Sequence, residues 1–148
     1  MIKVEEMMTR NPHTLSRTHT IADARNMMDA LDIRHIPIID NNQQLQGVIS
    51  QRDILAAQVS TLQQHRVNPS EDTTQLYEIM HTNVMTVAPQ AGLKESALYM
   101  HKHRIGCLLV VNKGQLEGII TDTDFIAIAI NLLEIQENIE PEETEAAD

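Results

Sequence analysis

The sequence predicts a mixed α/β fold of the α+β kind, made of two tandem repeats that each follow the element order β-α-β-β-α. One observation is internal repetition, because sliding the sequence by 72 places lays Thr14 on Thr86. After a one-residue gap in a turn the offset becomes 71, and Gly47–Ala56 then matches Gly118–Ala127. The other observation is apolar spacing, which changes between strand-like and helix-like periods in the same order in both halves. The chain is therefore interpreted as a tandem duplication.

Each half begins with an extended segment, predicted over 11–15 and 83–87, and continues with a helix. The first of these helices starts at Thr20, which has the spacing of a capping box. Two strands joined by a short turn follow in each half and predict a hairpin. A second helix then opens at Ser50 in the first half and at Thr121 in the second.

The predicted organisation is a first repeat over residues 1–59, a linker over 60–74, a second repeat with a C-terminal helix over 75–140, and an acidic disordered tail over 141–148. The linker is rich in polar residues, and the tail is rich in glutamate, a composition typical of disordered segments. The closing helix, predicted over Phe125–Ile139, has more apolar surface than an isolated edge helix usually shows. We therefore expect a subunit interface there, and a homodimer.

The net charge of −10 is concentrated at the C-terminal end. Seven acidic and no basic residues lie between Glu134 and Asp148, which leaves −3 for the rest of the chain. No basic face is visible, and only 2% of the residues are aromatic, so neither nucleic-acid backbones nor unpaired bases are expected partners.

Three further features indicate a cytoplasmic protein without a membrane partner. Cys107 is the only cysteine, which excludes an internal disulfide and fits a reducing compartment. The N-terminal residues lack the apolar region of a secretory signal. The longest apolar stretch, Phe125–Leu133, is far shorter than the roughly 20 residues that a spanning helix needs.

One eight-residue stretch occurs in both halves, as Gly47–Ile54 and as Gly118–Phe125. Each copy has a hydroxyl residue three places before an aspartate, directly after an apolar strand. This spacing places both polar groups where a strand ends and a helix begins. Backbone N–H groups at a helix start are unpaired, so such a corner can hold an anion or a sugar hydroxyl. Two such corners indicate a binding protein rather than a catalyst.

Three motifs occur in a fixed order and spacing: Met7-Met8-Thr9 with Pro12 and Thr14, then Ile33–Ile39, then Gly47–Ile54. Together with their duplication, these residues resemble a pair of CBS domains, the cystathionine-β-synthase-type repeat, which form a Bateman module. The resemblance covers roughly residues 1–135, and it is closest to the small stand-alone bacterial type.

The resemblance implies two pseudo-symmetric domains whose sheets pack together and leave two clefts. It also implies regulation rather than catalysis, with an adenosine-containing ligand such as AMP, ADP, ATP or S-adenosylmethionine bound between the repeats. No obligatory cofactor is expected. Binding of the nucleotide would then change how a dimer meets a regulated partner protein. The alternative reading is a structural dimerisation or adaptor module with empty clefts.

By the same resemblance, Asp53 and Asp124 would hold ribose, and Ser50 and Thr121 would face the ribose-phosphate. The adenine end of the clefts would be lined by Thr14, Ile36, Pro37, Thr86 and Leu108. A helix-capping role is the structural alternative for both hydroxyl–aspartate pairs, and the two roles can coexist.

Arg52 precedes Asp53 and could neutralise a phosphate, although it could equally be a solvated helix residue. The second half has Asp122 and Thr123 instead, which favours the Asp53 cleft if only one binds tightly. The seven histidines do not predict a metal site: His101 and His103 lie on different sides of a helix. No motif orients a nucleophile, so an enzyme is not expected.

Overall fold

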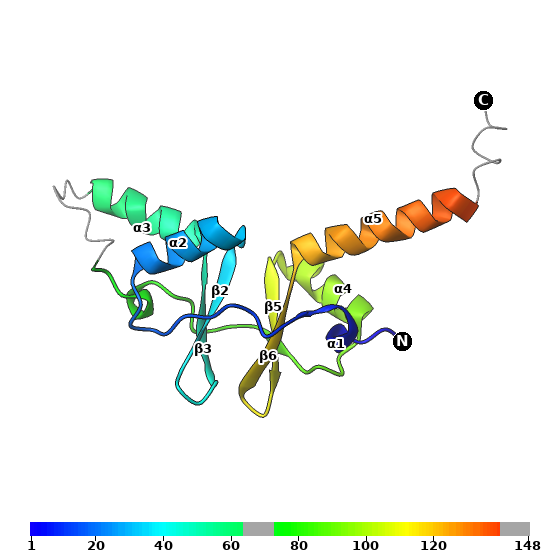
Figure 1. Cartoon of the computed structure of the whole chain (residues 1–148), viewed down its shortest axis with the longest axis horizontal. Coiled ribbons are helices and arrows are strands. Elements are labelled where there is room, and N and C mark those ends of the chain that lie inside the picture. The colour runs from blue at the N-terminus through cyan, green and yellow to red at the C-terminus, as the bar shows by residue number, and fades with distance from the viewer. Residues whose placement is uncertain (64–72, 140–148) are drawn as a thin grey trace.

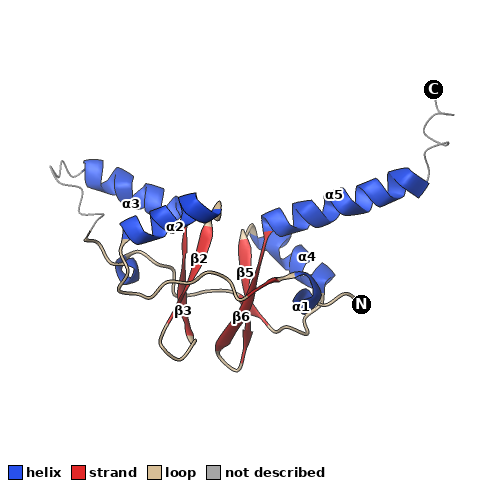
Figure 2. Ribbon diagram, in the orientation of Figure 1, coloured by secondary structure: helices blue, strands red, loops and turns tan. Residues whose placement is uncertain are grey.

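The computed structural model describes residues 1–63 and 73–139, and it has two hairpins side by side with helices on their outer flanks (Figures 1 and 2). The first hairpin consists of β2 (His35–Ile39) and β3 (Leu45–Ser50). Helices α2 (Ile21–Leu31) and α3 (Gln51–Gln63) pack against it. Helix α3 continues past Ser60, where the linker is predicted to begin; most of the predicted linker and the whole predicted tail lie outside the described residues.

The second repeat contains a four-stranded sheet in the order β1-β6-β5-β4. These strands are β1 (Thr9–Arg10), β6 (Gln115–Thr121), β5 (Cys107–Asn112) and β4 (Thr86–Val87). Helices α4 (Leu93–His103) and α5 (Asp122–Ile139) accompany this sheet (Figure 1). The first sheet has the same plan, with single bridges from Leu15 to Ile38 and from His81 to Val48 in place of β4 and β1.

The predicted capping box of α2 is confirmed. The Asp23 amide donates to Thr20 Oγ1 at 3.2 Å, and the Thr20 amide donates to the Asp23 carboxylate at 2.9 Å. Helices α2 and α4 both end on a residue in the left-handed region, Asp32 with φ 53° and Arg104 with φ 54°. These equivalent helix ends turn the chain sharply into β2 and β5, and both lie beside the centre of the molecule.

The segments that precede the repeats are exchanged between them. Helix α1 (Val4–Met7) packs with the second repeat, and the fully buried Val4 belongs to that core. The short 3₁₀ helix η2 (Leu76–Glu78) packs with the first repeat, and the fully buried Leu76 belongs to that core. Sequence similarity assigns 1–8 to the first copy and 75–80 to the second, so the unit of repetition and the unit of packing differ.

This exchange explains the glycine that opens the duplicated motif. A Cβ on Gly47 would lie 2.7 Å from the His81 carbonyl oxygen, and one on Gly118 would lie 2.9 Å from the Thr9 carbonyl oxygen. Thr9 pairs with Ile119 as His81 pairs with Val48. Only glycine lets the exchanged backbone approach each strand this closely.

The two sheets pack against each other, which confirms the predicted pair of repeats. Leu45 and Val48 of β3 pack on the buried Cys107, Leu109 and Ile119 of the second sheet. The two hairpin turns also hydrogen-bond, with the Leu45 amide donating to the Gly114 carbonyl at 3.3 Å and the Leu116 amide to the Gln43 carbonyl at 3.2 Å.

Helix α5 projects away from the rest of the molecule and has no buried residue (Figure 1). Its exposed apolar side chains include Ile126, Ile130 and Leu133, which are 60%, 51% and 59% exposed. Within the described part of the chain, no helix has both the length and the apolarity needed to span a bilayer.

Candidate functional site

Two cavities lie where the repeats meet. The first, here called the central cavity, has a volume of about 650 Å³ and is lined by residues that include Arg34, Ser50, Arg52, Arg104 and Asp122. The second, here called the second-repeat cleft, has a volume of about 380 Å³ and is lined by residues that include Thr9, Pro12, Asp32, Ile33, Thr121 and Asp124. Arg34, His35 and Asp122 line both, so the two cavities are contiguous.

The first duplicated corner forms a complete helix cap. The backbone amide and the hydroxyl of Ser50 both donate to Asp53 Oδ2 at 2.8 Å, and the Asp53 amide donates to Ser50 Oγ at 3.2 Å. One carboxylate oxygen of Asp53 is therefore used by its own helix start. The capping alternative is confirmed for this pair.

The second corner repeats this geometry. The Thr121 amide and hydroxyl donate to Asp124 Oδ2 at 2.8 and 3.2 Å, and the Asp124 amide donates to Thr121 Oγ1 at 3.3 Å. Both residues also line the second-repeat cleft. Capping and exposure to a cavity therefore coexist at this corner.

The two aspartates differ in what meets their second carboxylate oxygen. His81 Nε2 lies 2.7 Å from Asp53 Oδ1, and the Asp53 side chain is only 14% exposed. The residue equivalent to His81 is Thr9, which lines the second-repeat cleft beside Asp124. Over residues 1–63 and 73–139, no side chain hydrogen-bonds Asp124 Oδ1. The pseudo-symmetric corners are therefore not equivalent: one carboxylate is covered and the other faces a cleft.

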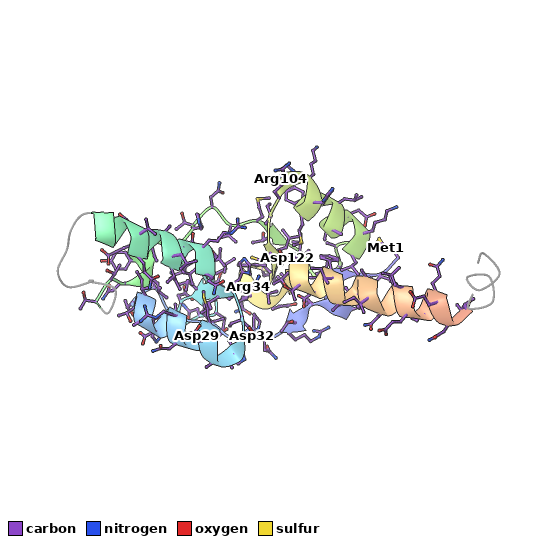
Figure 3. All side chains as sticks on the ribbon, turned by 90° about the horizontal axis from the view of Figure 1, so that it is seen from above. Met1, Asp29, Asp32, Arg34, Arg104 and Asp122 are labelled. Carbon is purple, nitrogen blue, oxygen red and sulfur yellow. The ribbon has the colours of Figure 1, made fainter. Side chains whose placement is uncertain are left out.

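The central cavity collects positive charge in an acidic chain. Arg34, Arg52 and Arg104 line it together with Asp122, the one carboxylate in its wall. Within the described residues, none of these arginines has a carboxylate within 4.0 Å. Seen from above, Arg34 and Asp122 lie in the middle of the molecule, and Arg104 lies at the α4 side (Figure 3). Anions are therefore favoured here over cations.

His35 lies between these charges at the junction of the two cavities. Burial lowers the pKa of His35, and the neighbouring Arg34 and Arg52 act in the same direction, while the Asp122 and Asp53 carboxylates oppose the shift. A Cβ on Gly106 would lie 3.2 Å from His35 Nε2, so a larger residue at position 106 would press on this ring. Because its pKa is lowered below the ordinary value of about 6.5, the imidazole is mostly uncharged at pH 7.

The structure places the ten predicted site residues in three groups. Ser50 and Arg52 line the central cavity, and Thr121 and Asp124 line the second-repeat cleft. Asp53, half-exposed Thr14 and exposed Thr86 line neither of these cavities. Ile36, Pro37 and Leu108 are fully buried, so their side chains contribute to the cores and not to the cavity walls.

Sequence reasoning noted Thr9 and Arg34 only as members of the family motifs, and it assigned no site role to either of them or to Arg104 and His81. The two arginines had a local signal, because each lies just before a strand where a helix has ended. His81 and Thr9 had none, since each meets the corner of the repeat to which its own sequence copy does not belong. That meeting follows from the exchanged segments.

Two other kinds of site find no support in the described part of the chain. No group of three or more histidine, cysteine or acidic side chains there is arranged to hold a metal ion. Burial, assisted by the Asp122 charge, raises the pKa of the Cys107 thiol to about 12, so this group is a poor nucleophile.

Comparisons with known proteins agree with this architecture. The crystal structure of AcuB from Vibrio cholerae is 64% identical and superposes with a TM-score of 0.84, covering 93% of this chain and 98% of that one. The CBS domain pair of MJ0100, solved with 5′-methylthioadenosine and S-adenosyl-L-methionine, is 25% identical with a TM-score of 0.74, covering 88% and 98%. YhcV of Bacillus subtilis is 28% identical, with 88% of this chain and 86% of YhcV covered.

The chain spans about a fifth of the length of two longer curated relatives. It covers 20% of a homoserine O-acetyltransferase from Methanocorpusculum labreanum and 22% of an inosine-5′-monophosphate dehydrogenase from Nitrosopumilus maritimus. It shares 31% and 30% identity with them over 74% and 80% of its own length. The profile of the CBS domain matches twice, over residues 4–60 and 76–131. The chain therefore belongs to the CBS-domain family and contains two tandem CBS domains.

Proposed function

We propose that the protein is a non-catalytic regulatory module that binds an adenosine-containing ligand in the second-repeat cleft. The observation that carries this proposal is Asp124, which lines a cleft of about 380 Å³ and whose carboxylate has only one oxygen engaged by its helix cap. A carboxylate held in this way can accept hydrogen bonds from both hydroxyls of a ribose. Pro12 and Ile33 supply apolar walls for a base.

The sequence favours the Asp53 cleft, but the geometry supports the Asp124 cleft. His81 lies against the oxygen that a ribose would need on Asp53. A ligand at Asp53 must first displace this contact, whereas a ligand at Asp124 finds no such competitor among the described residues. We therefore propose one nucleotide site per chain, formed by Thr121 and Asp124 together with the exchanged segment around Thr9–His13.

The related proteins support the class of ligand. The MJ0100 pair was crystallised with two adenosine compounds, 5′-methylthioadenosine and S-adenosyl-L-methionine. The proposed ligands are therefore AMP, ADP, ATP or S-adenosylmethionine. The name of the Vibrio cholerae protein refers to acetoin utilization, so enzymes of acetoin metabolism are the first partners to test.

Regulation would follow from the position of the cleft. Its walls come from the first repeat, at Asp32 and Ile33, and from the second repeat, at Thr121 and Asp124. A ligand that contacts both repeats favours whichever arrangement of the pair gives the better contacts. Helix α5 begins directly after Thr121, so a change in the position of Thr121 on ligand binding would also move the first turn of the projecting helix.

A thermal-shift panel with matched variants tests this proposal. A ligand at 100 times its Kd should stabilise the fold by roughly 2.7 kcal/mol, or a few degrees in Tm at this chain length. Asp124→Asn keeps an oxygen for the cap but removes the charge, so it should abolish most of the shift given by AMP or S-adenosylmethionine. Asp53→Asn, the equivalent change in the first repeat, should keep it. If the thermal shift is lost in Asp53→Asn but kept in Asp124→Asn, the site lies at the Asp53 corner instead.

A second function, dimerisation, is favoured by the apolar side chains of α5. Ile126, Ile130 and Leu133 follow helical spacing and are all more than half exposed. We propose that α5 of a second copy covers them, which would make the protein a homodimer. Leu133→Glu should then halve the mass measured by light scattering, whereas Glu134→Gln should leave it unchanged. A wild-type protein that is monomeric at micromolar concentration would contradict this proposal.

A further inference from the structure

We propose that the projecting half of α5 is a docking site for a basic amphipathic helix of a partner protein. The site consists of Leu132, Ile135 and Ile139, here called the outer stripe. This inference is separate from the nucleotide site. It is also separate from the proposed dimer contact around Ile130, which lies on another flank of the same helix.

The outer stripe continues a packed helix face beyond the body of the molecule. Phe125 and Ile128, at the base of α5, pack on the core of the second repeat. Leu132, Ile135 and Ile139 then follow Ile128 at intervals of four, three and four residues, which keeps them on the same face. Their side chains are 62%, 56% and 72% exposed, and Figure 1 shows this half of α5 projecting from the molecule. Nothing in the described part of the chain covers them.

Comparison with α3 separates the outer stripe from the proposed dimer contact. Leu55 and Val59 of α3 are exposed and occupy the positions of Ile126 and Ile130 in the other repeat. Both repeats therefore have an apolar flank there. At the positions equivalent to the outer stripe, the first repeat has only polar residues, which are Thr61, Gln64 and Asn68. The outer stripe thus indicates a second contact of α5, one that the first repeat does not share.

The charge around the outer stripe identifies its occupant. Glu134 and Glu137 are exposed on the same half of α5, and no basic residue occurs between Phe125 and Asp148. A second copy would bring together two segments that each have seven acidic residues between positions 134 and 148, and like charges oppose such a pairing. Lysine or arginine residues beside an apolar face would instead complement it.

The spacing of the outer stripe favours a helix as the partner element. Side chains three and four residues apart form ridges that fit into the grooves of another helix. An amphipathic helix that docks in this way presents its own apolar residues at the same intervals. The proposed occupant is therefore a helix with one apolar face and basic flanks.

Fluorescence anisotropy with designed peptides tests this inference on the full chain. The probe is a labelled peptide of leucine, alanine and lysine, with the leucines on one helix face. One comparison peptide has glutamate in place of every lysine, and the other has the same composition in an order that scatters the leucines. We expect a micromolar Kd for the probe, because the exposed half of α5 buries little area. Both comparison peptides should bind at least tenfold more weakly.

Substitutions in the outer stripe should weaken binding of the probe. Leu132→Gln and Ile135→Gln each remove an apolar contact and introduce a good helix former, so each should raise the Kd about tenfold. Glu134→Gln combined with Glu137→Gln should raise it about threefold, and this effect should shrink as salt is added. These four positions are exposed, so an unchanged Tm shows that the variants fold.

Two variants serve as matched controls. Leu98→Gln makes the same change at a position 57% exposed on α4, and Ile130→Gln makes an equivalent change on the other flank of α5. Each should leave the Kd of the probe within about twofold. Light scattering on Ile135→Gln should give the wild-type mass, because a second copy does not cover the outer stripe.

Three results would overturn the inference. Equal binding of the scattered peptide would mean that acidity alone attracts basic chains. An unchanged Kd in both Leu132→Gln and Ile135→Gln would place the contact elsewhere. A lower mass of Ile135→Gln would show that a second copy occupies the outer stripe. Loss of probe binding in the outer-stripe variants, with the mass retained, supports the inference.

Discussion

Asp53 and Asp124 occupy equivalent positions and make the same cap, yet their surroundings assign them different roles. The difference at the second carboxylate oxygen comes from the exchanged segments, which place His81 at one corner and Thr9 at the other. An imidazole 2.7 Å from Asp53 Oδ1 covers that carboxylate, whereas Thr9 leaves room for a cleft beside Asp124. At the residue scale, the proposed asymmetry of nucleotide binding therefore depends on this pair.

Exchanging the residue types at positions 9 and 81 should exchange the accessibility of the Asp53 and Asp124 carboxylates. His81→Thr should uncover Asp53 and create a second nucleotide site, because it gives the first corner the residue that the second corner has. Thr9→His should cover Asp124 and weaken binding in the second-repeat cleft at least tenfold. Fluorescence titration with a labelled adenine nucleotide measures both. Unchanged binding in both variants would mean that His81 does not control access.

His35 predicts an acid-dependent component of stability. Burial lowers its pKa below the ordinary value of about 6.5, so the unfolded chain binds this proton more readily than the folded chain does. The contribution of His35 to the free energy of unfolding is complete above the pKa that His35 has in the unfolded chain. It is lost as the pH falls through the lower pKa that His35 has in the folded protein. His35→Gln should therefore lose less Tm than the wild type between pH 7.5 and pH 5.

Cys107 predicts slow alkylation in the native state. Its thiol is buried, and a pKa of about 12 leaves almost no thiolate at neutral pH. Iodoacetamide should label the folded protein at least a hundredfold more slowly than the urea-unfolded protein, as followed by mass spectrometry. Equal rates would show that β5 opens readily.

The sequence predicts much at this scale, for a physical reason. The spacing of Ser50 and Asp53 predicts a local cap, and the cap is present because its hydrogen bonds span only three residues. The covering of Asp53 by His81 joins residues far apart in the chain. This contact depends on how distant parts of the chain fold together, so no local sequence pattern predicts it.

At the scale of elements, the exchanged segments stabilise both repeats. Residues 74 and 75 hydrogen-bond or bridge to the start of α2, and Ile2 and Lys3 do the same at the start of α4. The apolar periods predict the hairpins and their flanking helices, because those signals are local. They do not predict which core receives Val4 or Leu76, since an apolar period does not specify which of the two cores a segment contacts.

Leu76→Ala tests the exchange. Leu76 is fully buried in the first core, so the truncation should cost about 2–5 kcal/mol of unfolding free energy in urea titrations. Leu98→Ala, at a position 57% exposed on α4, should cost less than about 1 kcal/mol. Backbone hydrogen exchange in Leu76→Ala should increase first in β2 and β3; an increase confined to β5 and β6 would contradict the packing described here.

At the scale of the whole molecule, the pairing of repeats creates the site. Neither repeat alone forms the second-repeat cleft, because Ile33 and Asp124 come from different halves of the chain. Sequence reasoning predicts both the repeats and the hydroxyl–aspartate corners. It does not predict the contiguous cavities. Their walls also depend on the exchanged segments and on Asp32 and Arg104, the two residues with positive φ that end α2 and α4.

The stoichiometry of nucleotide binding tests the central claim most directly. Isothermal titration of the wild-type chain with ATP should give one site per chain, and Asp124→Asn should remove it while Asp53→Asn leaves it in place. Two equivalent sites per chain, or a single site that survives Asp124→Asn, would contradict the assignment of nucleotide binding to the second-repeat cleft.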